Sequence, residues 1–168
     1  MYKNELTEII PGLFLSDWKS AEDYQLLMKH KIKAIITIET RFKNQSVLDF
    51  YRMHNIDWMY IYAGDSPTDP LSRYFDVTAN FIQDHLNKGE NVLVHCWAGV
   101  SRSATIVLNY MIRDFIRTNG KNDKTYAFPL VQYMLKLTRK KRPIVNPNVG
   151  FVNQLYIKTV EYLFKILN

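Results

Sequence analysis

The chain has 168 residues, of which 47% are hydrophobic and 23% are charged. These values are typical of a globular protein and the length suits one domain, so wholesale disorder is excluded. Twenty-two Lys and Arg residues against 16 Asp and Glu residues give a net charge of +6, which favours anionic partners or substrates.

Two further absences narrow the class of protein. No apolar run approaches the roughly 18 residues of a membrane span, and the first ten residues lack a hydrophobic secretory core. We therefore expect a cytoplasmic protein without a membrane span. The single cysteine, Cys96, excludes an intramolecular disulfide and a metal site built from several thiolates.

The first half of the chain alternates short apolar segments with helical patterns. Strands are expected at 12–15, 34–38 and 58–62, where the apolar residues show no helical period. Helices are expected at 20–30, with Ser20 as N-cap, at 46–54 and at 71–87.

The second half begins with a strand at 92–94 that runs directly into His95. The segment 104–116 is apolar on nearly all sides, which is typical of a helix at the centre of a domain. A polar loop at 119–124 and helices at 130–141 and 149–167 follow. Alternating strands and helices predict a single-domain α/β fold over 1–168, with a central, mostly parallel sheet of four to five strands flanked by helices.

Cys96 lies in the segment His95-Cys96-Trp97-Ala98-Gly99-Val100-Ser101-Arg102-Ser103, between a buried strand and an apolar helix. The amides of such a tight loop and of the first helical turn converge on one point, where they bind an anion. Gly99 gives the loop backbone freedom, and Arg102 can present a planar fork to two phosphate oxygens. The same dipoles favour the thiolate form of Cys96, a nucleophile aimed at phosphorus.

The pattern His95-Cys96-x5-Arg102-Ser103 resembles the signature of cysteine-based protein phosphatases, and in detail that of the small dual-specificity phosphatases. The strands at 12–16 and 34–38, Asp65 after a strand, and Pro147-Asn148-x-Gly150-Phe151 follow the family's order, so the resemblance covers about residues 7–160. It implies hydrolysis of phosphotyrosine and of phosphoserine and phosphothreonine through a phosphocysteine intermediate, with no metal and no cofactor.

The resemblance also implies a role for each site residue. Cys96 is the expected nucleophile, and Asp65 is the acid that protonates the leaving oxygen and then acts as base. Ser103 donates to the Cys96 sulfur, or is the helix N-cap, and His95 tunes the thiolate through hydrogen bonds. The phosphate-binding set is Trp97, Ala98, Gly99, Val100, Ser101 and Arg102.

A second carboxylate, Asp69, competes for the role of general acid. Asp69 precedes Pro70 at the start of an amphipathic segment, which is typical of an N-cap before a proline at the first helical position. Asp65 directly follows the strand, on a loop with Gly64 and Pro67 that can bend over the pocket. Asp65 is therefore the favoured acid.

Two features leave alternatives open. Trp97, at the first variable position of the loop, either stacks on a substrate ring or packs against its neighbours. The basic run 139–142 suits a nuclear-import signal or a nucleic-acid patch, so nuclear entry stays open. The favoured interpretation is a helix C-terminus whose cations complement the helix dipole.

The substrate class follows from what the resemblance implies. We find no long pocket-deepening loop, which implies a shallow pocket open to phosphoserine and phosphothreonine beside phosphotyrosine. Phosphoinositide phosphatases usually place lysines in the loop, and RNA 5′-phosphatases have Asn-Arg-Thr-Gly where this chain has Ser101-Arg102-Ser103-Ala104. A non-catalytic phosphate-binding module would lack the nucleophile, the arginine or the acid, and this chain has all three. The phosphoinositide phosphatase, the RNA 5′-phosphatase and the binding module are therefore the less favoured alternatives. We expect a monomer that acts on phosphorylated proteins, with no obligatory nucleic acid.

Overall fold

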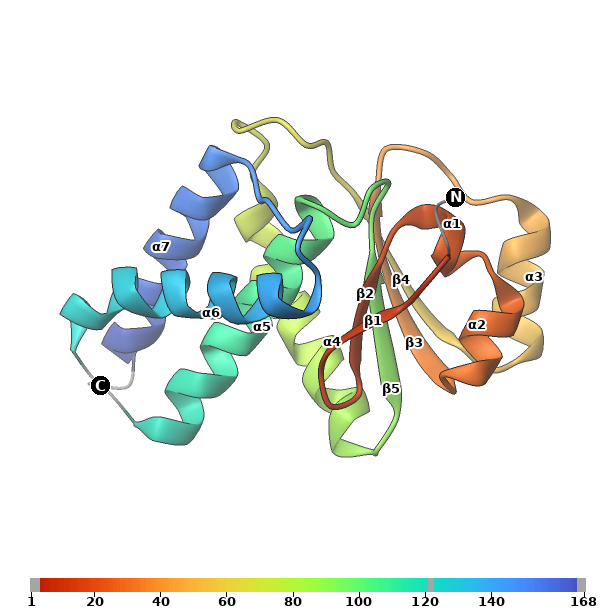
Figure 1. Ribbon diagram of the computed structural model, residues 1–168, viewed down its shortest axis with the longest axis horizontal. Helices are drawn as coiled ribbons and strands as arrows, with labels where there is room; N and C mark the ends of the chain where they lie inside the picture. Colours follow the sequence, from red (N-terminus) through yellow and green to blue (C-terminus); the bar gives the residue numbers. More distant parts are fainter. Residues whose placement is uncertain (1–3, 121–122, 166–168) are drawn as a thin grey trace.

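The computed structural model describes residues 4–120 and 123–165. Five strands form one sheet with helices on both faces (Figure 1). In chain order the elements are β1 (Thr7–Ile10), β2 (Leu13–Ser16), α1 (Trp18–Ala21), α2 (Tyr24–Lys29), β3 (Ile32–Glu39), α3 (Gln45–Met53), β4 (Asp57–Tyr62), the 3-10 helix η1 (Leu71–Tyr74), α4 (Phe75–Asn87), β5 (Asn91–His95), α5 (Arg102–Asn119), the 3-10 helix η2 (Lys124–Tyr126), α6 (Ala127–Lys141) and α7 (Val149–Lys165).

The sheet has the strand order β1-β2-β5-β3-β4. The pairs β2–β5, β5–β3 and β3–β4 are parallel, and only β1 runs antiparallel to its neighbour β2. The mostly parallel sheet expected from the sequence is therefore confirmed. Because β5 is the central strand, its carboxyl end at His95 lies among the ends of its neighbours, where open α/β sheets bind their ligands.

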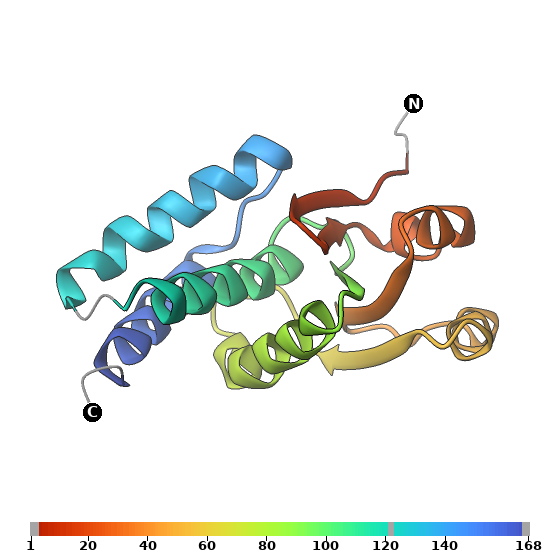
Figure 2. The ribbon, with the colours of Figure 1, turned by 90° about the horizontal axis from the view of Figure 1, so that it is seen from below.

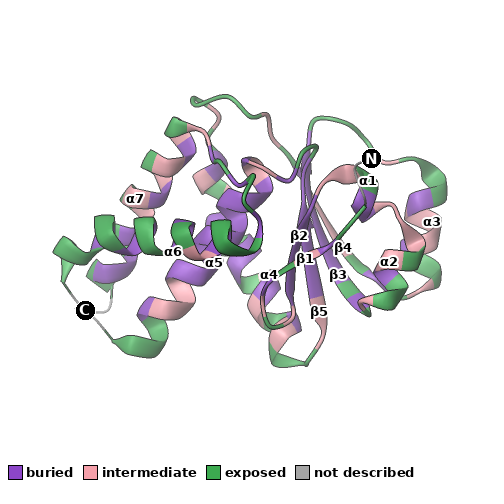
Figure 3. Ribbon diagram, viewed as in Figure 1, coloured by how far each residue is buried: buried purple, intermediate pink, exposed green. Residues whose placement is uncertain are grey.

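Two helical layers cover the sheet. Helices α4 to α7 lie on one face and α1 to α3 on the other, as two perpendicular views agree (Figures 1 and 2). Alternate strand residues enter the two layers: Ile36 and Val94 join the larger cluster, whereas Ile35 and Leu93 join the smaller one. The central strands are thus buried on both faces (Figure 3). None of the helices in the described ranges is both long and apolar enough to cross a membrane.

The N-terminal third differs from the expected elements. Strand β1 was not predicted, and the expected helix at 20–30 is two short helices. Asp23 causes the interruption, because its carboxylate accepts a hydrogen bond from the Leu26 amide at 3.2 Å and so begins α2. The N-cap of α1 is Asp17, which accepts from the Ser20 amide at 2.8 Å, so the assignment of Ser20 as N-cap is wrong.

Two other predicted boundaries also differ. The expected helix at 71–87 begins as η1, and Asp69 is not its N-cap: the Asp69 carboxylate accepts from the Ser66 amide at 2.8 Å and closes the preceding turn. Helix α6 starts at Ala127 rather than at residue 130. The predicted loop at 119–124 and helix at 149–167 include residues 121–122 and 166–167, which lie outside the described residues.

Candidate active site

The loop 96–101, called the phosphate loop below, joins the carboxyl end of β5 to the N-terminus of α5. Gly99 has a φ of +65°, and a Cβ there would lie 2.5 Å from the Ser16 carbonyl oxygen, so only glycine fits. Ser101 occupies the N-cap position of α5 but makes no side-chain cap, which leaves the amides of the first turn available to a ligand. Ser103 lies inside the helix, so its N-cap assignment is wrong.

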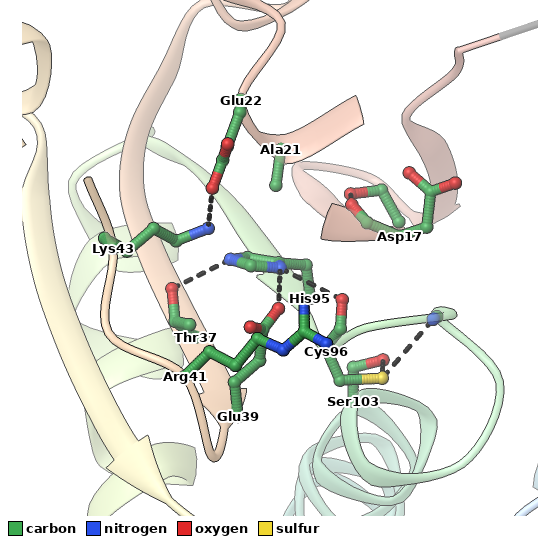
Figure 4. A network of polar contacts seen from close by, with 12 residues as sticks. Asp17, Ala21, Glu22, Thr37, Glu39, Arg41, Lys43, His95, Cys96 and Ser103 are labelled. Atoms are coloured by element: carbon green, nitrogen blue, oxygen red, sulfur yellow. Dashed lines mark hydrogen bonds and ion pairs between the residues drawn. The ribbon is translucent and has the colours of Figure 1, made fainter. Parts of the chain in front are cut away.

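Cys96 lies at the bottom of this loop and is only 2% exposed. Its Sγ accepts a hydrogen bond from the Gly99 amide at 3.3 Å and lies 3.1 Å from the Ser103 hydroxyl (Figure 4). Ser103 is fully buried and therefore cannot exchange this contact for bulk water. The Gly99 amide and the Ser103 hydroxyl thus both lie within hydrogen-bond distance of the sulfur at the bottom of the loop.

Arg102 is the first residue of α5. Its Nη1 donates to the Ala63 carbonyl at 3.0 Å, which ties the guanidinium to the end of β4. Its Nε is buried and has no hydrogen-bond partner among the described residues. A buried donor left without an acceptor is costly, so an anion bound here would satisfy it.

The structure brings Asp65 to the loop. Asp65 Oδ1 accepts from the Ser101 hydroxyl at 2.7 Å and from the Asn148 side-chain amide at 3.0 Å. The same Asn148 amide group also approaches the Asp65 carbonyl at 3.3 Å. The carboxylate is thus held at the phosphate loop by Ser101 of the loop itself and by Asn148 from the segment before α7.

Asp69 lies elsewhere in the same segment. Its carboxylate faces Gly64 and the Ser66 amide, within its own turn, and its carbonyl accepts from Gln154 at 2.8 Å. Of the two candidate acids, Asp65 alone makes a hydrogen bond to the phosphate loop among the described contacts. The sequence preference for Asp65 agrees with this geometry.

His95 is completely buried beneath the loop (Figure 4). Its Nε2 lies 2.8 Å from the Thr37 hydroxyl, and its Nδ1 lies 3.2 Å from the Cys96 carbonyl. Burial and the nearby Lys43 charge hold the pKa of His95 well below its ordinary value. A neutral ring with its proton on Nδ1 fits both contacts, because Thr37 accepts from Trp58 and can then donate to Nε2.

Glu39 ends β3 next to this histidine and is only 6% exposed. Its Oε1 lies 3.7 Å from His95 Nδ1, too far for a hydrogen bond, and finds no other partner among the described residues. Burial raises the pKa of Glu39, although Lys43 and Arg102 oppose the shift. Residues 4–120 and 123–165 contain no cluster of three or more His, Cys, Asp or Glu side chains placed to hold a metal.

Arg142 supports the loop from behind, a role that the sequence reading missed. It is only 6% exposed; its Nε donates to the Gly99 carbonyl at 2.9 Å, and its Nη2 approaches the Ala98 carbonyl at 3.4 Å. Its third nitrogen reaches Thr7 on β1 at 3.1 Å. The position of Arg142 at the end of a basic run concealed this role, because only the tertiary structure separates it from the exposed Lys140 and Lys141.

Asn148 is a second missed residue. It donates to Asp65, its own backbone amide donates to Ser101 Oγ at 3.0 Å, and its Oδ1 accepts from the Phe151 amide at 2.9 Å. It therefore links the acid loop, the phosphate loop and the start of α7. Its place in Pro147-Asn148-x-Gly150-Phe151 was the signal that could have identified it.

Trp97 points to the rim of the loop and is 42% exposed. Its ring stacks on Trp18, with centroids 5.0 Å apart and planes 17° apart, and its carbonyl accepts from the Trp18 amide at 3.1 Å. The Arg41 guanidinium lies 4.3 Å from the Trp97 ring centroid. Of the two interpretations left open, packing against neighbours is the one seen, and part of the indole still faces outwards.

Comparison with known proteins agrees with this architecture. The family model described as the dual specificity phosphatase catalytic domain matches residues 13–160. Human dual specificity protein phosphatase 22 is 34% identical over 90% of this chain and 72% of its own length. Human serine/threonine/tyrosine-interacting protein is 36% identical over 98% of this chain and 69% of its own.

Solved structures give the same result. The crystal structure of DUSP15 superposes with a TM-score of 0.79 and 31% identity, over 98% of this chain and 93% of that one. The crystal structure of human tyrosine phosphatase-like serine/threonine/tyrosine-interacting protein superposes with a TM-score of 0.76 and 30% identity. The match covers 96% of this chain and 99% of that one. With the strand–loop–helix around Cys96 and a sheet of the expected topology, these matches place the chain in the dual-specificity phosphatase family of protein phosphatases.

Proposed function

We propose that this protein hydrolyses phosphotyrosine and phosphoserine or phosphothreonine in protein substrates through a phosphocysteine intermediate. The observation that carries the proposal is the position of Cys96 Sγ, between the Gly99 amide and the Ser103 hydroxyl at the bottom of the anion-binding loop. A phosphate held by the loop amides would have its phosphorus directly above this sulfur.

In the first step the Cys96 thiolate attacks phosphorus, so that a P–S bond forms and the P–O bond to the leaving group breaks. Asp65, in its protonated form, gives its proton to the leaving oxygen. Arg102 and the amides of 97–101 stabilise the charge on the equatorial phosphate oxygens. A phosphate oxygen would also supply the missing acceptor for Arg102 Nε.

In the second step water attacks phosphorus and the P–S bond breaks. The Asp65 carboxylate takes a proton from the water, and inorganic phosphate leaves. The Ser103 hydroxyl donates to the departing Cys96 sulfur, which makes the thiolate a better leaving group. His95 is a positioning residue: as a neutral ring it fixes the Cys96 carbonyl and so the start of the loop.

Other parts of the proposal rest on the sequence. We expect one catalytic domain over 1–168, a monomer, and a cytoplasmic location. The name of one relative describes an interacting protein, which keeps a phosphate-binding module as the competing function. Cys96, Arg102 and Asp65, all present and all at the loop, favour turnover over binding alone.

The test is hydrolysis of matched phosphotyrosine and phosphothreonine peptides by wild type, Cys96→Ser and Asp65→Asn, with EDTA present. Turnover of both peptides by wild type, its loss in Cys96→Ser and a trapped phosphate on Cys96 after acid quench would support the proposal. A phosphoinositide and a 5′-triphosphorylated RNA are run alongside. Turnover of one of these alone would reassign the substrate class, and inertness on all four would leave a binding module.

A further inference from the structure

Arg41 lies at the mouth of the phosphate loop, two residues after the end of β3. Its guanidinium stacks on the Trp97 ring at 4.3 Å, and Trp97 is itself held by stacking on Trp18. Figure 4 shows Arg41 and Glu39 near His95 and Cys96, where the loop begins. An arginine held in this way has a restricted orientation even though it is exposed.

Among the described residues, the Arg41 guanidinium has no hydrogen-bond acceptor and no ion-pair partner. It lies over the Trp97 ring, 4.3 Å from the ring centroid. A cation–π contact uses none of the N–H donors of a guanidinium, so they stay available to an anion. Such a fork is preorganised for two oxygens of one anion, because little side-chain entropy remains to be lost.

A cavity of about 210 Å³ connects this arginine with the phosphate site. Its lining residues are Glu39, Thr40, Arg41, Trp97 and Arg102. Arg102 belongs to the phosphate loop, so an anion in the cavity would lie beside a phosphate bound above Cys96. This volume is sufficient for a carboxylate or a phosphate group.

The charges around the cavity also favour an anion. Arg41 and Arg102 line it together with one acid, Glu39. Lys43 also lies near Glu39, but it is paired with Glu22 at 3.0 Å. Glu39 is nearly buried, and burial raises the pKa of its carboxyl. The balance at the mouth of the loop is therefore positive.

We infer that Arg41, oriented by Trp97, forms a subsite for a second anionic group of the phosphorylated substrate, either a carboxylate or a second phosphate, next to the phosphate that is hydrolysed. The inference rests on the proposed function and assigns a specificity determinant to it. Trp97 is the positioning residue of this subsite and Arg41 is the group that contacts the substrate.

The test uses a phosphotyrosine peptide with neutral flanks and matched peptides with Glu at one flanking position at a time. A further peptide carries a non-hydrolysable phosphonate at the best position, which distinguishes a second phosphate from a carboxylate. The readout is the ratio of kcat/KM on the acidic peptide to that on the neutral peptide, taken within each variant. Wild type should favour at least one acidic peptide by about tenfold, as expected for a charge-assisted bidentate contact.

Arg41→Gln should bring this ratio close to one. Arg41→Lys keeps the charge but not the fork or the stack and should keep only a small part of the preference. Trp97→Leu should lower the ratio although Arg41 is still present. Lys19→Gln is the matched control. It removes an exposed positive charge beside Trp18, and Lys19 does not line the cavity, so the ratio should stay as in wild type.

A wild-type ratio near one at every position, or an unchanged ratio in Arg41→Gln, would overturn the inference while the proposed function stands. Calorimetry of the same peptides with Cys96→Ser measures binding without turnover and so tests whether the subsite exists when the proposed function fails. Preference for acidic peptides there, with a wild type that hydrolyses none of them, would retain the subsite and reject the proposed function. Equal binding of neutral and acidic peptides would reject the subsite independently of turnover.

Discussion

The base and the rim of the phosphate loop are built in different ways. The base, formed by His95, Cys96 and Ser103, is buried and comes from one continuous strand–loop–helix segment. The rim, formed by Asp65, Asn148, Arg41 and Trp97, is largely exposed and comes from four separate parts of the chain. In the function and the subsite proposed above, the base supplies the nucleophile and the phosphate cradle, whereas the rim supplies the acid and the selection of substrates.

Removal of the sulfur should have the largest effect of all. Cys96→Ser is expected to lower kcat by about 10³-fold or more, because a neutral hydroxyl replaces the nucleophile in the base. The midpoint of thermal unfolding should change little, since serine is of similar size and keeps the contact with Ser103. Peptide turnover and a thermal melt measure the two effects. Residual turnover within tenfold of wild type would exclude Cys96 as nucleophile.

The acid on the rim should matter in proportion to how poor the leaving group is. Asp65→Asn is expected to lower kcat on a phosphothreonine peptide by about 10²-fold, and less on an activated aryl phosphate whose leaving group needs no proton. Asp69→Asn is the matched control, because its carboxylate serves its own turn. Equal losses on both substrates, or a greater loss in Asp69→Asn, would move the acid role away from Asp65.

Substitution of Arg142, which supports the loop from behind, should lower both stability and activity. Arg142→Met removes the guanidinium donors from the Gly99 and Ala98 carbonyls, which should cost about 1–3 kcal/mol in the free energy of unfolding. The kcat should fall as well, since these carbonyls shape the loop. Lys141→Met, on the neighbouring exposed residue, is the control for loss of charge. Urea unfolding that gave both variants the same stability would show that Arg142 does not hold the loop.

The smallest expected effect concerns pH and the buried histidine of the base. The pKa of His95 is well below its ordinary value in the folded state, so the unfolded chain binds a proton that the folded chain does not. Stability should therefore decrease as the pH falls below about 6.5, by at most about 1.4 kcal/mol per pH unit from this residue. Urea unfolding between about pH 7.5 and pH 5.5 measures the slope, and His95→Asn should flatten it. Identical slopes for the two proteins would contradict a neutral His95.

Much of the base could be predicted because its residues are neighbours in the sequence. An apolar strand, a loop with Gly99 and an apolar helix together predict the position of the thiol and of the anion-binding amides, and the structure places both there. The α/β class and the mostly parallel sheet followed from periodicity in the same way. The errors lie where local hydrogen bonds compete with helix formation, as at Asp23 and Asp69.

The sequence by itself thus determined the fold class and the position of the loop that carries Cys96 and leads into Arg102, since these depend on local spacing and on burial of apolar residues. Only the tertiary structure separated Arg142 from the exposed basic residues beside it, joined Asn148 to Asp65, and placed Arg41 on Trp97. Each of these contacts links segments far apart in the chain. Their geometry depends on how helices and strands pack, so these contacts could not be predicted from the residue pattern of any single segment.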